Sequence, residues 1–498
     1  MTSISRRDFV KASGLALAGA GMGVPRFGAQ AAQESRDLPE RPNVLLIMTD
    51  QQSADALSCR MGKVGRNYLH TPNMDRLFAE GVGFERAYCP NPLCAPSRTS
   101  MLTGRFPHEV GIQENGLPLS SRDYVRNLDM PCLGVAFRDA GYNTGYLGKI
   151  HNVHGTFDFN DVDDEDIDHG FEYTANMGHN GIDDDMLDPA KDFLEKQQNE
   201  DSPFFLVASY NNPHNICEWA RGTRGDKLPD GAVEDPDLAD CPPLRTNHLP
   251  PEDEPRIMSF MRRSYSATGM SPVYDHTEAD WRKHQWGYYK MTEIVDRHIG
   301  DLLQALRDSG QEENTLVVFL SDHGDMQGAH EWNQKWVFYD EASRVPMAFH
   351  WPGVINPGTR YQLVHTGVDL IPTLCGLTGV KRPPDLPGTD LTETIMQDKP
   401  KGRDFLVCSN YLEAGAEVGG VRRTPSGRMV RGERFKYCVY DTGEASEELY
   451  DMVNDPGEMK NLAHNSDYED VVRQYRGYLE EFRQKYNDDE FQPFYETS

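Results

Sequence analysis

The residues best suited to chemistry gather first at residues 90–112 of this 498-residue chain, in the stretch PNPLCAPSRTSMLTGRFPHEVGI. A thiol, Cys94, stands four residues before Arg98, and a second arginine and a histidine follow at Arg105 and His108. A lone cysteine is usually a small, buried, structural residue. The residues that flank Cys94 favour a thiol committed to chemistry instead.

More polar residues follow three short apolar runs, at residues 43–49, 204–209 and 315–321. Continuous hydrophobic runs that alternate with helical patterns are typical of a parallel sheet covered on both faces. In such sheets, ligands gather beyond the carboxyl ends of the strands. The acidic residues and histidines that these runs would deliver to that edge are Asp50, His214, Asp322 and His323.

The remaining patterns predict the fold class. Apolar spacing from 280 to 306 indicates a long helix, while strand-like pieces at 428–430 and 435–440 precede an amphipathic helix near 468–486. We therefore expect an α/β fold: a large, mostly parallel central sheet flanked by helices, with a smaller C-terminal α+β subdomain carrying an antiparallel sheet. The predicted divisions are a signal peptide at 1–32, a catalytic domain at 33–395 and the C-terminal subdomain at 396–498.

The first 32 residues predict export. They contain the pair Arg6-Arg7, a short apolar run at 12–24 and the sequence Ala-Gln-Ala at 29–31, which together are typical of a twin-arginine signal peptide. The apolar run is too short and too rich in glycine for a membrane anchor. We expect the Tat translocase to carry the folded protein, which would be periplasmic or secreted.

Composition narrows the class of partner. The formal net charge of −29 argues against nucleic acid, although a local arginine cluster would still bind an anionic substrate because distant charges are screened. The acidic run at 159–188 is predicted as a solvated loop in preference to a calcium site. Nine scattered cysteines contain no C-x-x-C pair, which excludes a zinc ribbon or thioredoxin chemistry.

Several motifs together resemble the type I sulfatases of the alkaline-phosphatase-like superfamily. The most specific is Cys94-Ala-Pro-Ser-Arg98, followed by Leu-Thr-Gly-Arg at 102–105. Further matches are residues 141–151 (GYNTGYLGKIH), 321–325 (SDHGD), 335–346 and 448–463. The resemblance thus spans nearly the whole mature chain. It implies hydrolysis of sulfate monoesters, with Cys94 oxidised to formylglycine by a maturase before export.

The resemblance also implies a metal site and a set of catalytic roles. The implied ligands are Asp50, Gln51, Asp322, His323 and the modified residue 94. Many sulfatases have a second aspartate where this chain has Gln51, so one charge is missing. Oxygen-rich ligation favours calcium over manganese or zinc.

The implied catalytic residues are cations and histidines. Arg98 and Lys149 would hold the formylglycine, and His151 would remove the proton that releases sulfate. His214 and Lys335 would bind the sulfate group, with His214 also protonating the leaving alcohol. These residue types suit the roles, because fixed cations stabilise developing negative charge and histidine transfers protons near neutral pH.

The segment after His214 suggests the substrate. Trp219, Arg221 and Arg224 combine an aromatic ring with guanidinium groups, which suits a sulfated sugar, although an ordinary surface loop would contain the same residues. A sulfated carbohydrate is favoured over an aryl sulfate or choline sulfate. His108 and His330 remain open between a supporting role and a structural one.

Two alternative functions remain. A phosphonate monoester or phosphodiester hydrolase would share the nucleophile and the Asp-Gln and Asp-His metal pattern. A non-catalytic protein that binds sulfated glycans would keep Cys94 as a thiol.

Overall fold

An eight-stranded sheet forms the centre of the molecule. The computed structural model describes residues 41–63, 65–115, 132–150, 169–175, 183–222, 235–269, 271, 275–397, 399, 402–412, 415–443 and 446–495. The strands are β1 (Asn43–Asp50), β2 (Val82–Tyr88), β3 (Asn143–Gly148), β4 (Tyr173–Ala175), β5 (Phe204–Pro213), β6 (Thr315–Ser321), β7 (Met347–His350) and β8 (Gly358–His365). Their order is β4-β3-β5-β1-β6-β7-β2-β8, and only β7 runs antiparallel to its neighbours.

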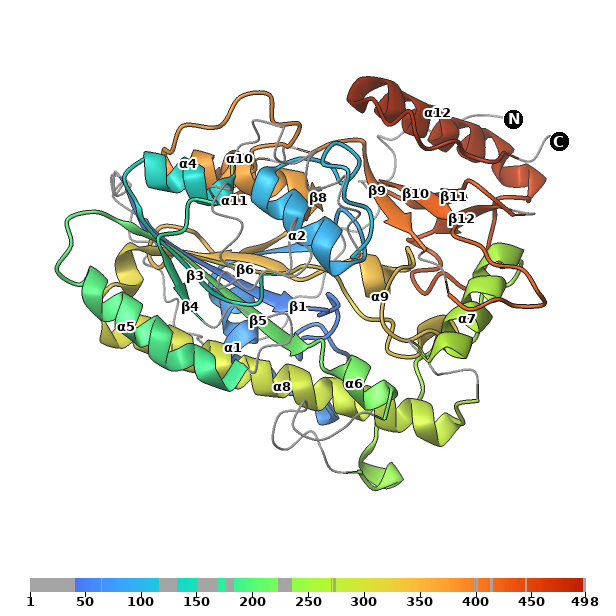
Figure 1. Cartoon of the computed structure of the whole chain (residues 1–498), viewed down its shortest axis with the longest axis horizontal. Helices are drawn as coiled ribbons and strands as arrows, with labels where there is room; N and C mark the ends of the chain where they lie inside the picture. The colour runs from blue at the N-terminus through green and yellow to red at the C-terminus, as the bar shows by residue number, and fades with distance from the viewer. Residues whose placement is uncertain are drawn as a thin grey trace, which may run out of the picture. The chain divides into compact units, whose positions relative to one another are not determined.

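Both faces of this sheet are buried, as the continuous apolar runs require. Along β1, Val44, Leu46 and Met48 enter one hydrophobic core, and Leu45 and Ile47 enter the other, because successive side chains point to opposite faces. The first core is covered by α2 (Cys94–Thr103), α4 (Leu133–Asp139), α10 (Thr366–Thr378) and α11 (Thr392–Gln397). The second is covered by α1 (Pro72–Glu80), α5 (Leu187–Gln197) and α8 (Glu278–Asp308), as Figure 1 shows.

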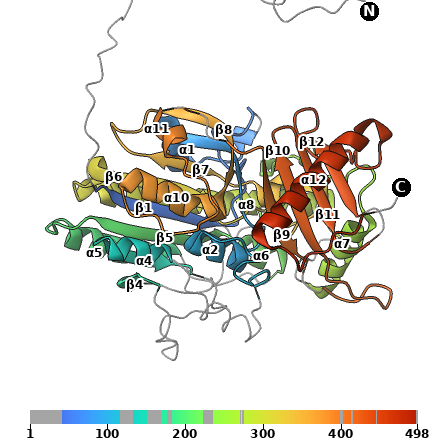
Figure 2. The same ribbon diagram turned by 90° about the horizontal axis from the view of Figure 1, so that it is seen from above.

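A second, four-stranded sheet is built near the C-terminus. Its strands are β9 (Phe405–Tyr411), β10 (Ser426–Gly432), β11 (Phe435–Tyr440) and β12 (Glu447–Asp451), all antiparallel in the order β12-β11-β10-β9. One face packs against α12 (Glu469–Tyr486), visible across the strands in Figure 2. The other face packs against α7 (Arg256–Thr268) and the segment 326–339, which leads into the short helix α9 (Asp340–Ser343).

The predicted fold class is confirmed, with a large mostly parallel sheet and a separate antiparallel one. The long helix and the C-terminal helix were each placed within two residues of α8 and α12. The division predicted between 395 and 396 falls inside α11, and the small sheet begins only at Phe405. The predicted signal peptide lies outside the described residues.

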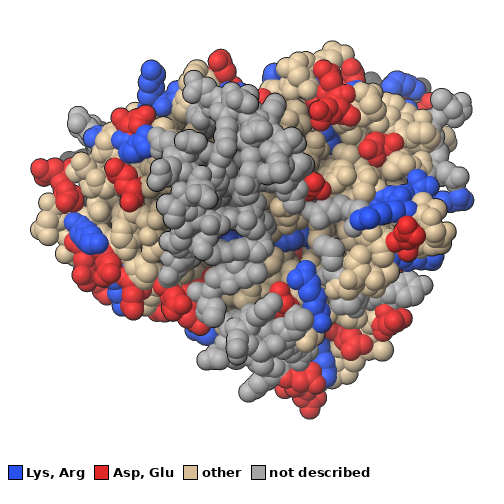
Figure 3. All heavy atoms as spheres, viewed as in Figure 1, with Lys and Arg blue, Asp and Glu red and all other residues tan. Residues whose placement is uncertain are grey.

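Other expectations from composition have mixed outcomes. Within the described residues, no helix is long and apolar enough to cross a membrane. No disulfide links any of the nine cysteines, all of which are described. Acidic and basic side chains are interspersed over the face seen in Figure 3. The acidic run at 159–188 is described only at its end and at 169–175, and Asp183 within it is buried rather than solvated.

Candidate active site

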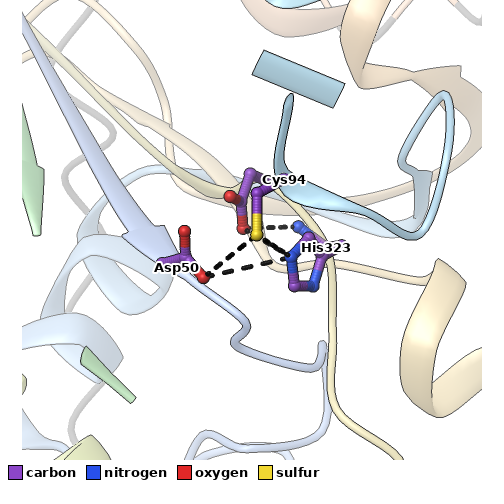
Figure 4. A group of neighbouring side chains, drawn as sticks. Asp50, Cys94 and His323 are labelled. Atoms are coloured by element: carbon purple, nitrogen blue, oxygen red, sulfur yellow. Dashed lines mark hydrogen bonds and ion pairs between the residues drawn. The ribbon is translucent and has the colours of Figure 1, made fainter. Parts of the chain in front are cut away.

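Cys94 begins α2 and lies at the centre of a cluster of buried polar side chains. Its Sγ is 3.1 Å from Nε2 of His323, 2.9 Å from Nζ of Lys335 and 3.9 Å from Oδ1 of Asp50. Figure 4 shows the Asp50, Cys94 and His323 side chains pointing toward one another. The thiol is therefore surrounded by charged and metal-ligating groups rather than by the apolar residues that surround a structural cysteine.

The sheet brings these groups together, as the sequence predicted. Asp50 ends β1, while Asp322 and His323 directly follow β6. The two strands are parallel neighbours, with Thr49 paired to Ser321, so their carboxyl ends meet at one edge. The first turn of α2 then places Cys94 between them.

Arg98 and Lys149 form ion pairs with the two carboxylates of the cluster. Arg98 lies one turn after Cys94 on α2 and spans both carboxylates, with Nε 2.7 Å from Asp322 Oδ2 and Nη2 3.0 Å from Asp50 Oδ2. Lys149, which follows β3, places Nζ 2.9 Å from the same Asp50 oxygen. Burial and Cys94 raise the pKa of Asp50, but the cations Lys149 and Arg98 outweigh them and hold it well below its usual range.

Lys335 reaches Cys94 from a strained loop. Its Nζ is 2.9 Å from both Cys94 Sγ and Gln51 Oε1, and 3.3 Å from Nε2 of His323. Five non-glycine residues of this loop have positive φ, a cost that is usually found where a site requires it. They are Gln327, His330, Glu331, Gln334 and Trp336. Backbone bonds close the loop on itself and tie it to residues 247 and 248.

Gln51 is held in one orientation by its neighbours. Its Nε2 donates to Oδ2 of Asp325 over 2.6 Å, so its Oε1 faces Lys335. Its backbone has φ of 68° and is fixed by hydrogen bonds with Asp322 Oδ1 and the Tyr288 hydroxyl. Because a carboxylate only accepts, Asp325 determines which way the amide points. Burial raises the pKa of Asp325 to about 6.

Sequence reasoning assigned no role to Asp325 or Cys217. Asp325 was visible as the last residue of the SDHGD motif, three residues after Asp322. Cys217 lies with Sγ 3.4 Å from Gln51 Nε2, and nothing in its sequence context marked it.

His214 follows β5 and lies at the edge of the cluster, half-buried and in contact with Cys94. Burial, with the nearby cations Lys149 and Lys335, lowers its pKa to about 3. The imidazole is therefore neutral while no anion occupies the site. His151 lies outside the described residues.

The predicted substrate-binding residues fare differently. Trp219 lies on α6 (Ile216–Ala220), is only 5% exposed, and packs into the core beside Gly287 of α8, so its ring offers no open face in this structure. Arg221 is exposed, with an ion pair of 3.5 Å to Glu218. Arg224 lies outside the described residues.

The structure places His108 and His330, whose roles the sequence did not decide, in contact with residues outside the Cys94 cluster. His108, five residues after the end of α2, forms a hydrogen bond between its Nε2 and the carbonyl of Tyr486, the last residue of α12. His330 is buried and stacks on Tyr339, with ring centroids 4.0 Å apart. Both positions indicate structural roles.

The cluster has the composition and dimensions of a cation site. One donor atom each from Asp50, Cys94, Asp322 and His323 lies within 4.8 Å of the others. Ligand bonds to divalent cations are about 2.0–2.6 Å, so donors around one ion must lie within roughly 4–5 Å of each other. Two carboxylates and an imidazole around one point fit a divalent cation.

Comparison with known proteins agrees with this geometry. Residues 42–380 match the family described as Sulfatase, and residues 328–485 match N-sulphoglucosamine sulphohydrolase, C-terminal. The Delta 4,5-hexuronate-2-O-sulfatase of Bacteroides thetaiotaomicron is 30% identical over 477 residues, covering 94% of this chain and 93% of the relative.

Solved structures give the same result. A 2-O GAG sulfatase is similar with a TM-score of 0.73 and 26% identity, covering 92% of this chain and 95% of its own. A second structure, in complex with its substrate D-glucosamine-2-N,6-O-disulfate, has a TM-score of 0.66 and 25% identity, covering 90% and 98%. With the family matched over most of its length, the chain belongs to the sulfatases.

Proposed function

We propose that this sulfatase hydrolyses sulfate monoesters of a carbohydrate, using formylglycine made from Cys94 and a bound calcium ion. The setting of residue 94 carries the proposal. Its side chain lies among two buried carboxylates, His323 and Lys335. Such surroundings serve a nucleophile that must approach an anionic ester, because fixed charges stabilise the negative charge that develops in the transition state.

The hydrated aldehyde would offer two hydroxyl groups on one carbon. One hydroxyl releases its proton to solvent and its oxygen attacks sulfur, the bond from sulfur to the sugar oxygen breaks, and His214 gives the sugar oxygen a proton. The second hydroxyl then loses its proton to His151, sulfate leaves, and the aldehyde is restored. Arg98 and Lys149 keep residue 94 in place, while Lys335 binds the sulfate group.

The low pKa of His214 is consistent with this role. In the absence of substrate, Lys149 and Lys335 add to the effect of burial and keep the imidazole neutral. A sulfate group bound near these lysines offsets their charge, which raises the pKa of His214 toward that of a proton donor. Binding of the anion thereby prepares the acid.

Asp50, Asp322, His323 and residue 94 would hold the metal, with Oε1 of Gln51 as a further oxygen donor. When bound, a divalent cation supplies Lewis acidity beside the sulfate ester. The oxygen-rich donor set supports calcium, while the imidazole is also compatible with manganese or zinc.

Relatives support a carbohydrate as the substrate. A 2-O-sulfatase acting on a hexuronate and a structure holding a disulfated glucosamine are both similar over nearly the full chain. The exposed guanidinium of Arg221, one helical turn beyond Cys217, is suited to a further anionic group on the sugar. The twin-arginine motif supports periplasmic or secreted action on external glycans, after a maturase has modified Cys94 before export.

Peptide mass spectrometry across residues 87–98 tests the proposal, with protein made with and without a matching maturase. We expect an aldehyde or its hydrate at position 94 in the first sample, together with hydrolysis of sulfated sugars. An unmodified thiol and no hydrolysis in either sample would favour a glycan-binding protein.

The phosphonate monoester hydrolase alternative rests on Gln51 beside Asp50, where one anionic ligand is missing. Rates on an aryl sulfate and an aryl phosphonate ester, compared in one preparation, decide between the two activities. A higher kcat/KM on the phosphonate ester would overturn the sulfatase assignment of the site.

A further inference from the structure

The end of β5 departs from regular pairing just before His214. β5 pairs with β1 in register up to Ser209, opposite Met48, but the next pair is Pro213 with Asp50. Four residues of β5 therefore advance against two of β1, which is a bulge. On the other side, the pairing with β3 ends at Ser209, opposite Gly148. The backbone N–H groups between Ser209 and Pro213 need partners from elsewhere, because a buried unpaired N–H is costly.

Asp183 accepts from two of them. Its Oδ1 accepts from the backbone N–H of Asn211 over 2.7 Å, and its Oδ2 accepts from the backbone N–H of Asn212 over 2.9 Å. The Asn212 side chain donates to the same Oδ2 over 2.8 Å. Asp183 opens a short 3-10 helix (Asp183–Met186) and is 4% exposed, whereas Asp184 beside it is exposed.

The peptide that Asp183 holds is also the one that holds His214. The carbonyl of Asn211 accepts from the backbone N–H of His214 over 3.0 Å, and the Asn211 side chain bonds to Asn215 over 2.5 Å. The carboxylate thus fixes the turn from which the imidazole projects toward Cys94.

We propose that Asp183 is a positioning residue that aligns His214 with the oxygen of the leaving alcohol. The proposal rests on the proposed function, in which His214 is the proton donor. A sugar alkoxide is a poor leaving group and must be protonated, whereas 4-nitrophenolate leaves without help. The contribution of Asp183 should therefore increase with the basicity of the leaving group.

The test compares Asp183→Asn with the wild type on two esters, a sulfated monosaccharide and 4-nitrophenyl sulfate. The amide keeps the size of the side chain but turns an N–H toward one of the backbone donors. We expect kcat on the sugar ester to fall by about 100-fold, since a displacement of about 1 Å can cost that much. On 4-nitrophenyl sulfate we expect kcat to stay within about threefold, because no protonation is needed.

A double-mutant cycle separates positioning from general damage. In a His214→Asn background, Asp183→Asn should reduce the rate on the sugar ester no further, since the donor that it aligns is gone. Asp184→Asn is the matched control, because Asp184 bonds to His298 at the surface and not to Asn211 or Asn212. That variant should retain wild-type rates on both esters.

Equal losses on both esters, or independent losses in the cycle, would overturn the inference. If Asp183→Asn does not fold, Asn212→Ala removes only the side-chain bond to the carboxylate and should show the same preference with a smaller loss. An Asn212→Ala enzyme without that preference also counts against the proposal. A wild-type enzyme that cleaves neither ester would instead refute the proposed function, so the two failures are distinguishable.

Discussion

Two buried lysines of the molecule differ in their contacts. Lys436, in the small sheet, contacts carboxylates, whereas Lys335, at the edge of the large sheet, contacts groups of other kinds. Lys436 on β11 is completely buried, with Nζ 2.6 Å from Asp340 Oδ1, 2.8 Å from Glu458 Oε1 and 3.0 Å from the carbonyl of Phe338. Lys335 is 3% exposed, yet its hydrogen-bond partners are an amide oxygen, a thiol and an imidazole. Among the described residues, no carboxylate is in ion-pair contact with Lys335.

The difference indicates what each lysine is for. A buried charge is costly unless it is paired and hydrogen-bonded, and Lys436 meets that condition with residues of its own chain. Lys335 contacts no carboxylate among the described residues, and a loop with five positive-φ residues holds it in place. Burial lowers its pKa, but the nearby charges of Cys94 and Asp50 outweigh burial and raise it. A buried cation held in this way beside the proposed nucleophile is suited to a substrate that brings its own negative charge. In the proposed function the sulfate group would supply that charge, whereas the network around Lys436 is complete in the folded chain.

The largest expected effect removes the nucleophile. Cys94→Ala should abolish sulfate ester hydrolysis, because the proposed formylglycine is made from this residue. The melting temperature should stay close to that of the wild type, since the change deletes one small buried atom. Activity assays and thermal unfolding on the same preparation check both expectations, and a fully active alanine variant would refute the assignment.

Replacing each lysine by methionine tests directly whether Lys335 serves activity and Lys436 serves stability. Lys335→Met should lower kcat/KM for sulfate esters by about 100- to 1,000-fold, the usual cost of removing one group that stabilises developing charge. Its stability should change little, because no carboxylate in contact with Lys335 would be left buried without a cation, and Asp50 keeps Arg98 and Lys149 as partners. Steady-state kinetics and denaturant unfolding would show whether function and stability separate in this way.

Lys436→Met should do the reverse. It leaves the carboxylates of Asp340 and Glu458 buried without their cation, which costs about 3–5 kcal/mol of the free energy of unfolding. The folded fraction should retain wild-type kcat at a temperature where the variant is still native. A stable Lys436→Met protein with impaired kcat would mean that the two networks are not separate in function.

A buried ionisable group without an ion-pair partner can also become neutral by protonation, and Glu448 in the small sheet is an example. Glu448 receives hydrogen bonds from Tyr339, Tyr440 and Tyr450, with Glu254 and Lys436 as its charged neighbours. Burial is the main cause that raises its pKa to about 7. Among the described residues no cation is in ion-pair contact with Glu448, so this group takes up a proton, whereas Lys335 keeps its charge.

The pH dependence of stability follows from that shift. Because the folded pKa of Glu448 lies above the unfolded value of about 4.5, the folded state binds the proton more tightly between the two. The stabilisation is complete below the unfolded pKa and is lost as the pH rises through about 7, a difference of roughly 3 kcal/mol. Glu448→Gln should match the wild type at pH 4 and exceed it at pH 8.5 in thermal unfolding. The same curves for Glu433→Gln, at an exposed position, should follow the wild type, and a Glu448→Gln curve that does so would contradict the shift.

Sequence patterns predicted the parts of the site that lie at strand ends. Asp50, Asp322 and His323 follow runs whose apolar character fixes them as buried strands, so the sheet edge brings them together. The family motif located Arg98, Lys149 and Lys335, which periodicity alone does not distinguish from other cations. The difference between the contacts of Lys335 and those of Lys436 became visible only in the folded structure.

The expectations that differ from the structure concern residues whose burial depends on packing between elements far apart in the sequence. Trp219 was expected to face a sugar, but Gly287 on α8 leaves room for its indole, which packs inward. Asp183 stood in a run predicted to be a solvated loop, yet the bulge of β5 creates two unpaired N–H groups that bury it. Neither the small residue nor the bulge is adjacent in sequence to the residue it affects.

The smallest expected effect concerns how Gln51 is kept facing Lys335. Asp325 accepts from Nε2 of Gln51 and from the backbone N–H of Gln327 over 2.7 Å, so both of its oxygens are used as acceptors. In Asp325→Asn one of them becomes a donor, which allows the Gln51 amide to turn its own N–H groups toward the cluster. We expect calcium affinity to fall by about 10- to 100-fold, as is usual when a group that orients a ligand is lost. Calorimetric titration of chelator-treated protein measures this without turnover. An unchanged affinity would show that Gln51 contributes no oxygen to the ion, leaving Asp50, Asp322, His323 and residue 94 as its protein ligands.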